Sequence, residues 1–216
     1  EQLLTTLAPV IAPAPAPPLT VGVMTPEDLS GVEQSDIHRA LERGGAVLAA
    51  AERRDVPVIL MARHLVEPRM TRELMSTDTV HVPVDIDGDI ARVGPVVIPG
   101  STACVMCRHA HRRDRDRLWP TGAAQALSRP ATPWHPDLVD DAVRLALTLL
   151  RAVQREDPAV RGRRVTVQRY QARRQWSAHQ PHAGCSCRSL EGIVTPGVHD
   201  DRWIAPTTAT GIAPPA

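Results

Sequence analysis

Two residue types are missing from this chain. None of its 216 residues is lysine or phenylalanine, so every strongly basic side chain is arginine. The lack of lysine excludes a Schiff-base mechanism and a P-loop, because both need a lysine amine. The chain also lacks the dinucleotide-binding pattern G-x-G-x-x-G and the esterase pattern G-x-S-x-G. We therefore assign no catalytic residue from the sequence.

Long apolar runs and an excess of charge of one sign are absent too. No run approaches the roughly 18 apolar residues that span a bilayer, and the amino-terminal residues lack the pattern of a signal peptide. The 25 arginines balance 24 acidic residues, which gives a formal net charge of +1. This balance predicts no general affinity for nucleic acid or membrane surfaces. We expect a cytoplasmic protein, and the composition indicates a bacterial gene of high GC content.

The sequence predicts one α/β domain with irregular ends. An arm and proline-rich linker are expected over residues 1–19, the domain over residues 20–203, and a tail rich in Thr, Ala and Pro over residues 204–216. Within the domain, apolar patterns predict strands at residues 21–24 and 58–61. An amphipathic helix is expected between them, at residues 37–54. Strand, helix and strand in this order predict a parallel βαβ unit.

The second half of the domain predicts antiparallel pairing. The dipeptide Asp87-Gly88 suits the positive φ angles of a hairpin turn, and apolar runs at residues 80–84 and 90–98 flank it. Residues 137–153 are apolar around much of the expected helix surface, which predicts a buried helix. Two late strands are expected at residues 165–170 and 174–177. The predicted sheet is therefore mixed, with flanking helices.

The four cysteines form two close pairs, Cys104-Val-Met-Cys107 and Cys185-Ser-Cys187. The pairs are separated by 77 residues, from residue 108 to residue 184. In each pair, a tight turn lets both thiolates converge on one ion, and zinc accepts four thiolates in a tetrahedron. The pattern therefore predicts a structural zinc site with four cysteine ligands, which joins two distant segments.

Other interpretations of the cysteines stay open: a redox-active C-x-x-C, two disulfides, or four unconnected buried thiols. The absence of a secretory signal disfavours disulfides, and a redox dithiol would leave the second pair unexplained. Nearby histidines could be alternative ligands, although we expect them to be exposed or hydrogen-bonded to a thiolate. They are His109, His111, His179 and His182. Residues 108–117 carry charges of both signs, which predicts a solvated helix rather than a nucleic-acid patch.

Two longer motifs surround the cysteine pairs. The first is Val93-Gly-Pro-Val-Val-Ile-Pro-Gly-Ser-Thr-Ala-Cys104-Val-Met-Cys107, followed by Arg113-Asp-Arg-Asp-Arg-Leu-Trp-Pro120, and the second is His182-Ala-Gly-Cys185-Ser-Cys187. Together they resemble the ThiF-like domain of cyclodehydratase components in the biosynthesis of thiazole/oxazole-modified peptides. The second motif is similar to the family's closing His-Pro-x-Cys-Gly-Cys, with Ala183 and Ser186 in place of Pro and Gly. The resemblance covers roughly residues 58–187.

This resemblance implies a ThiF-like fold, related to ubiquitin-activating enzymes, in which the four cysteines form the zinc knuckle. The amino-terminal nucleotide-binding part of that fold could be missing here, and we expect this chain not to bind ATP. It implies a non-catalytic subunit that scaffolds or presents a ribosomal precursor peptide to a YcaO-type cyclodehydratase, and it leaves a homodimer open. The family's winged-helix module for leader peptides is not found in residues 1–20.

Two further hypotheses remain. One is an ATP-dependent adenylating enzyme of the ThiF class whose nucleotide loop is missing from this chain. The other is a zinc-stabilised protein of unrelated function whose motifs match by coincidence.

Overall fold

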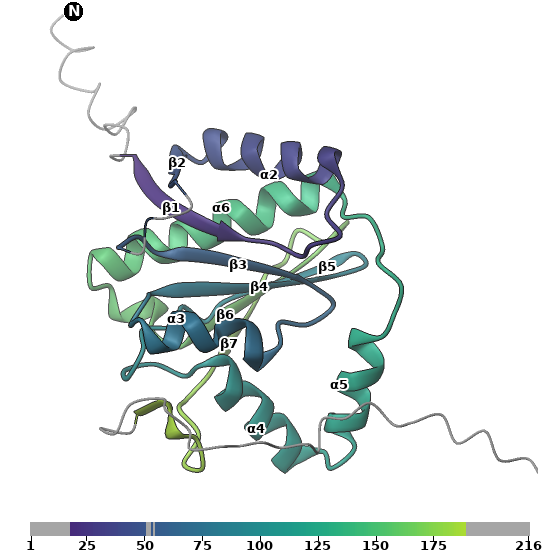
Figure 1. Ribbon diagram of the computed structural model, residues 1–216, viewed down its shortest axis with the longest axis vertical. Helices are drawn as coiled ribbons and strands as arrows, with labels where there is room; N and C mark the ends of the chain where they lie inside the picture. Colours follow the sequence, from purple (N-terminus) through teal and green to yellow (C-terminus); the bar gives the residue numbers. More distant parts are fainter. Residues whose placement is uncertain (1–17, 51–52, 54, 189–216) are drawn as a thin grey trace, which may run out of the picture.

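A seven-stranded mixed sheet with helices on both faces forms the centre of the structure (Figure 1). The computed structural model describes residues 18–50, 53 and 55–188. The predicted tail over residues 204–216 and most of the predicted arm lie outside these residues, so the proposed domain bounds stay a prediction. The predicted class, α/β with a mixed sheet, is confirmed.

The strand order is β2-β1-β3-β4-β5-β6-β7. The pairs β1–β2, β1–β3 and β3–β4 are parallel, whereas the three pairs from β4 to β7 are antiparallel. The strands are β1 (Leu19–Met24), β2 (Ala46–Leu48), β3 (Val58–Arg63), β4 (His81–Asp87), β5 (Ile90–Val93), β6 (Arg163–Gln168) and β7 (Gln175–Ala178).

Helices α2 and α6 pack together over one face of the sheet, and α3 and α4 cover part of the other. Figure 1 shows α6 running behind the sheet and α3 in front of it. None of the helices in the described part of the chain is long and apolar enough to cross a bilayer. The helices are α2 (Gly31–Arg43), α3 (Arg72–Ser76), α4 (Val105–Arg115), α5 (Trp119–Leu127) and α6 (Pro136–Gln154), with short 3-10 turns η1 (Pro68–Thr71), η2 (Pro158–Val160) and η3 (Ser186–Arg188).

Strand β3 carries apolar side chains on both of its faces. Ile59 and Met61 belong to the core beneath α6, whereas Leu60 and Ala62 belong to the core beneath α3 and α4. Because both faces of the strand are covered, its positions from Val58 to Ala62 favour apolar side chains.

The predicted parallel βαβ unit is confirmed, since β1 and β3 pair in parallel with α2 between them in the chain. The predicted bounds of the helix, residues 37–54, are wrong at both ends. Ser30 and Glu33 form a capping box, each accepting a hydrogen bond from the other's backbone N–H, and this box starts α2 earlier. Gly44 caps its carboxyl end, and Gly45 has a φ of +64°, which turns the chain into β2.

The predicted hairpin is confirmed, with Gly88 at a φ of +58° between β4 and β5. Strand β5 ends at Val93, earlier than predicted, because Gly94 has a φ of +87° and Pro95 has no N–H to donate to a ladder. The predicted buried helix is α6. The two late strands are β6 and β7, displaced by one or two residues from their predicted bounds.

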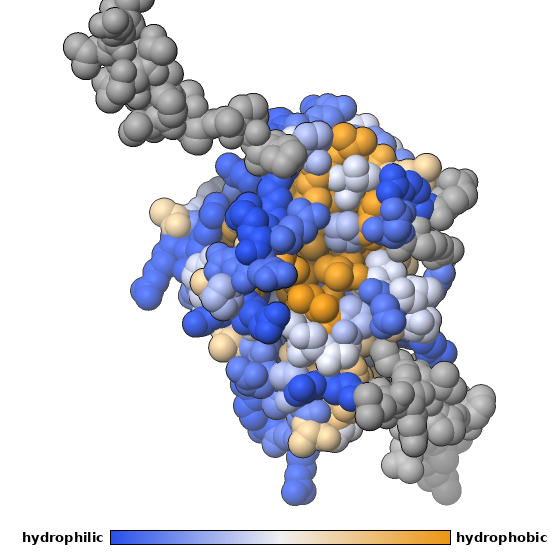
Figure 2. All heavy atoms as spheres, turned by 90° about the vertical axis from the view of Figure 1, so that its left-hand side faces the viewer, coloured by the Kyte–Doolittle hydropathy of each residue, from blue (hydrophilic) through white to orange (hydrophobic). Residues whose placement is uncertain are grey.

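Apolar side chains gather on the side of the molecule shown in Figure 2, the side at which α6 ends in Figure 1. A hollow of about 470 Å³ follows the end of α6 and is walled by Val96, Val153 and Val160, with Glu156 at its edge. It lies near the amino end of β4, because the neighbouring Val97 bridges His81. Ligands of open α/β sheets bind at the opposite, carboxyl edge of the strands.

Candidate metal centre

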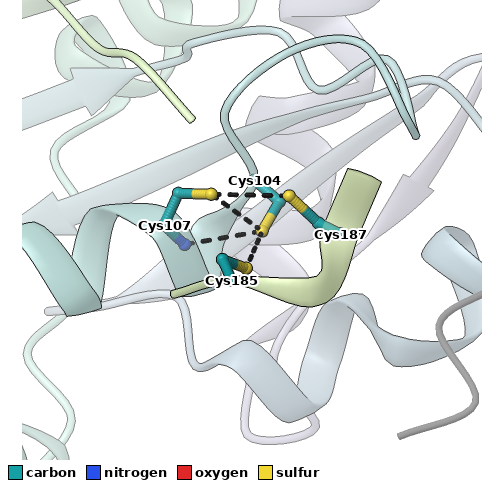
Figure 3. A group of neighbouring side chains, drawn as sticks. All are labelled: Cys104, Cys107, Cys185 and Cys187. Carbon is teal, nitrogen blue, oxygen red and sulfur yellow. Dashed lines mark hydrogen bonds between the residues drawn. The ribbon is translucent and has the colours of Figure 1, made fainter. Parts of the chain in front are cut away.

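The four cysteine side chains meet at the amino end of α4, and their sulfur atoms point toward one another (Figure 3). Cys104 is the N-cap of α4, and Cys107 lies in its first turn. Cys187 lies in the turn η3, and Cys185 comes just before that turn. The structure therefore brings together the two predicted pairs, which are far apart in the chain.

The spacing of the sulfur atoms matches a tetrahedral metal site. The Cys104 sulfur lies 3.7 Å from the sulfurs of Cys107 and Cys185, and the sulfurs of Cys107 and Cys187 lie 3.5 Å apart. All four lie within 4.8 Å of one another. Four sulfurs placed about 2.3 Å from a central zinc ion would be about 3.8 Å apart. A disulfide needs about 2.05 Å, and all four cysteines are free thiols.

The surroundings of the cluster stabilise thiolates. Cys104, Cys107 and Cys187 are buried, and Cys185 is half-buried. The backbone N–H of Cys107 donates to the Cys104 sulfur at 3.5 Å, and the backbone N–H of His182 donates to the Cys107 sulfur at 3.3 Å. The position of both sulfurs at a helix amino end also favours negative charge. These donors suit sulfur atoms that bind a cation.

The protons of the thiols are shared unequally. Hydrogen bonds from Cys104 lower the pKa of the Cys107 thiol well below its ordinary value, and they lower the pKa of Cys185 to about 7. Donating to Cys107 raises the pKa of Cys104 in turn. Because metal ligation requires deprotonated sulfur, a bound cation would release the remaining protons, and affinity for it would fall in acid.

The candidate histidine ligands lie outside the sulfur cluster, which contains only cysteines among the described residues. The His182 side chain contacts Asp114, with 2.7 Å between Nε2 and Oδ2, while its backbone supports Cys107 as described above. His111 Nε2 lies 3.0 Å from a backbone oxygen, and His179 Nε2 lies 3.0 Å from the hydroxyl of a serine. These rings are therefore hydrogen-bonded elsewhere.

The expectation that the histidines are exposed or bonded to a thiolate is wrong for His109. Its side chain is buried, its Nε2 lies 3.2 Å from the backbone oxygen of Val66, and its Nδ1 accepts a hydrogen bond from Trp119 at 3.3 Å. Burial lowers the pKa of His109 to about 4. The ring is thus a neutral packing element between α4 and the residues before α3.

The expectation of a solvated helix at residues 108–117 is also wrong in part. The segment is helical within α4, but Arg108 is only 3 % exposed. Its Nη1 lies 3.5 Å from Oδ2 of Asp85, which also pairs with Arg164, and Asp85 Oδ1 accepts a hydrogen bond from the backbone of Val66 at 2.7 Å. The carboxylate of Asp85, which lies between the apolar Val84 and Ile86 of β4, is the sequence signal for this buried ion cluster.

Carboxylates occupy the carboxyl edge of β1, where a Rossmann-type sheet would bind a nucleotide. Glu33 of α2 pairs with Arg63 at 3.0 Å, and Asp28 pairs with the same guanidinium at 3.1 Å. Arg63 also lies 4.9 Å from the ring centre of Trp134. Burial raises the pKa of Glu33, but hydrogen bonds from Arg63 and from the backbone of Trp134 outweigh this effect and lower the pKa to about 2. The ionised carboxylate of Glu33, paired with Arg63, therefore occupies this edge.

The described part of the chain shares its fold with heterocyclases and with an MccB protein. A heterocyclase in complex with substrate and cofactor matches with a TM-score of 0.58 and 17 % identity, over 76 % of this chain and 24 % of that chain. The heterocyclase TruD matches with a TM-score of 0.55 and 16 % identity, over 76 % of this chain and 26 % of that chain. Escherichia coli MccB with MccA matches with a TM-score of 0.50 and 13 % identity, over 79 % of this chain and 59 % of that chain.

These likenesses show the fold alone: the chain has the fold of part of the two heterocyclases. The chain spans about a quarter of the length of the two heterocyclases. No family model matches the chain, and no curated protein matches it.

Proposed function

We propose that this chain is a zinc-containing, ThiF-like subunit of a cyclodehydratase complex. In this role it scaffolds or presents a ribosomal precursor peptide to a YcaO-type partner, which carries out the cyclisation. The observation that supports the proposal most is the fold shared with part of two heterocyclases, one of them solved with substrate and cofactor. In this proposal, the chemistry of the complex lies in the partner.

The cysteine cluster supports a structural metal in this subunit. Cys104, Cys107, Cys185 and Cys187 would hold a zinc ion with four thiolates. Four protein ligands leave no open position for a water or substrate, which is typical of structural rather than catalytic zinc. The ion would cross-link α4 to the turn η3.

The carboxyl edge of β1 supports a non-catalytic role. The phosphates of a nucleoside triphosphate bound there would lie close to the carboxylates of Glu33 and Asp28 and would be repelled by them. The guanidinium of Arg63 is already paired with both carboxylates. The local electrostatics therefore disfavour ATP, and they favour the scaffold over an adenylating enzyme.

The proposal can be tested with the full chain, the YcaO-type protein and the precursor peptide encoded nearest to its gene. We expect the chain to co-purify with both, and ring formation, measured by mass spectrometry as loss of one water per ring, to need the chain. Failure to bind either component would overturn the scaffold role. Exchange of pyrophosphate into ATP by the chain and peptide alone would instead support the adenylating enzyme.

A further inference from the structure

A second group of side chains with unusual chemistry lies on the sheet face that α4 covers. We call it the arginine cluster: Arg92, Arg108, Arg112 and Arg164, around Asp85. The strand register places Asp85 of β4 opposite Arg92 of β5, and Arg92 opposite Thr166 of β6. These positions form one row across the sheet. Their strand neighbours pack in the core beneath α6, so the row faces α4.

The cluster buries more positive than negative charge. Arg108 and Arg164 are 3 % and 4 % exposed, and both pair with the single carboxylate of Asp85, which is 1 % exposed. Burying an ion costs several kcal/mol unless it is paired, and one carboxylate neutralises only one of the two guanidinium groups. The buried cluster therefore carries positive charge that no buried carboxylate of the cluster compensates.

Specific donors in the cluster have no acceptor among the described residues. Arg108 uses Nη1 for Asp85 and for the backbone oxygen of Gly94, but its Nε and Nη2 are buried without a partner. Arg164 uses Nη2 for Asp85, and its Nε is likewise unpartnered. The Nε and Nη2 atoms form one edge of a guanidinium, which can bind two oxygens of a phosphate or carboxylate at once. Arg108 therefore presents a complete fork.

Two further arginines extend the cluster toward solvent. Arg92 and Arg112 are half-buried, and neither has an ion-pair partner in the part of the chain that the structure describes. The Arg112 guanidinium stacks on Trp119, 4.3 Å from the ring centre. Burial lowers the pKa of Arg164 well below its ordinary value, and the charges of Arg108 and Arg112 lower it further. The four guanidinium groups thus lie close enough to repel one another.

We propose that the arginine cluster binds a doubly charged oxyanion of the phosphate type, either inorganic phosphate or the phosphate group of a monoester. Four guanidinium groups against one carboxylate leave three positive charges, which a dianion offsets better than a single carboxylate. A phosphate also has enough oxygens to accept from the Arg108 fork, from Arg164 Nε and from one half-buried arginine. The half-buried Arg112 and Arg92 would contact the ion from the solvent side. This site is separate from the proposed scaffold role and does not depend on it.

The test measures binding of inorganic phosphate to the zinc-loaded full chain by calorimetry and by thermal melts, with chloride at equal ionic strength as reference. We expect phosphate to raise the melting temperature in a concentration-dependent way, since a ligand of the native state stabilises it. Arg112→Gln should weaken binding at least tenfold. The matched control is Arg113→Gln, which removes the same charge from the same helix at an exposed position.

Arg112→Gln and Arg113→Gln leave the buried ion pairs of Asp85 with Arg108 and Arg164 intact, so both variants should remain folded. A phosphate effect no larger than that of chloride would overturn the proposal, and so would equal weakening by Arg112→Gln and Arg113→Gln. Glycerol phosphate in place of inorganic phosphate distinguishes the sources: tighter binding assigns the site to a monoester, and weaker binding assigns it to the free ion. Succinate binding as tightly as phosphate would contradict the preference for a phosphate-type ion.

Discussion

Replacing one thiolate should reveal whether a metal ion holds the fold together. Cys187 is 6 % exposed, and its sulfur lies 3.5 Å from that of Cys107. Serine is close to cysteine in shape, but its hydroxyl does not ionise at neutral pH and is a poor zinc ligand. Cys187→Ser would therefore leave the ion with three ligands and release η3 from α4.

The expected loss of folding stability is large compared with the loss that an ordinary substitution causes. A structural zinc site contributes roughly 10–16 kcal/mol of apparent binding free energy, which becomes folding free energy. The whole native state of a domain is stable by only about 5–15 kcal/mol. Weakening the site should thus cost about 3–5 kcal/mol in free energy of unfolding. For a domain of this size, that corresponds to a melting temperature lower by roughly 6–20 °C.

The assay combines metal analysis with thermal melts of the purified chain. The wild type should contain about one zinc ion per chain, and Cys187→Ser should contain much less. The control is Ser186→Ala, an exposed neighbour in the same turn, which should change stability by less than about 0.5 kcal/mol. A folded wild type without metal, or equal melts for the two variants, would refute the reasoning.

Three further predictions concern the rest of the fold. Burial lowers the pKa of His81 from 6.5 to about 4. The free energy of unfolding should therefore fall by up to about 3 kcal/mol as the pH drops from 6.5 to 4. In urea titrations at several pH values, the free energy of unfolding of His81→Asn should depend less on pH than that of the wild type. The pKa of Glu33 is lowered from 4.5 to about 2. Its ionised form therefore stabilises the fold above pH 4.5, and about 2–3 kcal/mol of this stability should be lost as the pH falls from 4.5 to 2. Glu33→Gln should remove this loss of stability in acid. Gly44→Ala would place a Cβ 2.4 Å from Leu147 and should cost about 1–3 kcal/mol in chemical denaturation, whereas Gly122→Ala meets nothing within 4 Å and should gain about 0.5–1 kcal/mol.

The features that follow from local spacing could be predicted from the sequence. Asp87 and Gly88 mark the hairpin because a tight turn constrains its own residues. The cysteine pairs indicate one shared site because two ligands close in sequence already share most of the geometry. The bounds predicted for α2 are wrong because they rest on the apolar periodicity of residues 37–54 alone. The capping box of Ser30 and Glu33 and the pair of glycines after Arg43 are stronger evidence of where it begins and ends.

Features that depend on tertiary register could not be predicted in this way. Strand β2 has three residues, and its Val47 and Leu48 are exposed, so pairing with β1 alone defines it as a strand. The ion cluster around Asp85 depends on the alignment of β4 with β6 and on the placement of α4 over both. No spacing within the sequence encodes that alignment, because the partners come from segments far apart in the chain.

Helix α4 links the two sites. Cys104 and Cys107 occupy its amino end, while Arg108 and Arg112 follow on the same helix and belong to the arginine cluster. If the metal fixes the position of α4, Cys187→Ser should reduce phosphate binding at least tenfold at a temperature below its melting point, whereas Arg112→Gln should leave the zinc content unchanged. Calorimetry of the two variants, with circular dichroism to check that each is folded, measures this one-way dependence. Phosphate binding that is unchanged in folded Cys187→Ser would show that the packing of buried Val105 and Ala110 is enough to hold the helix in place.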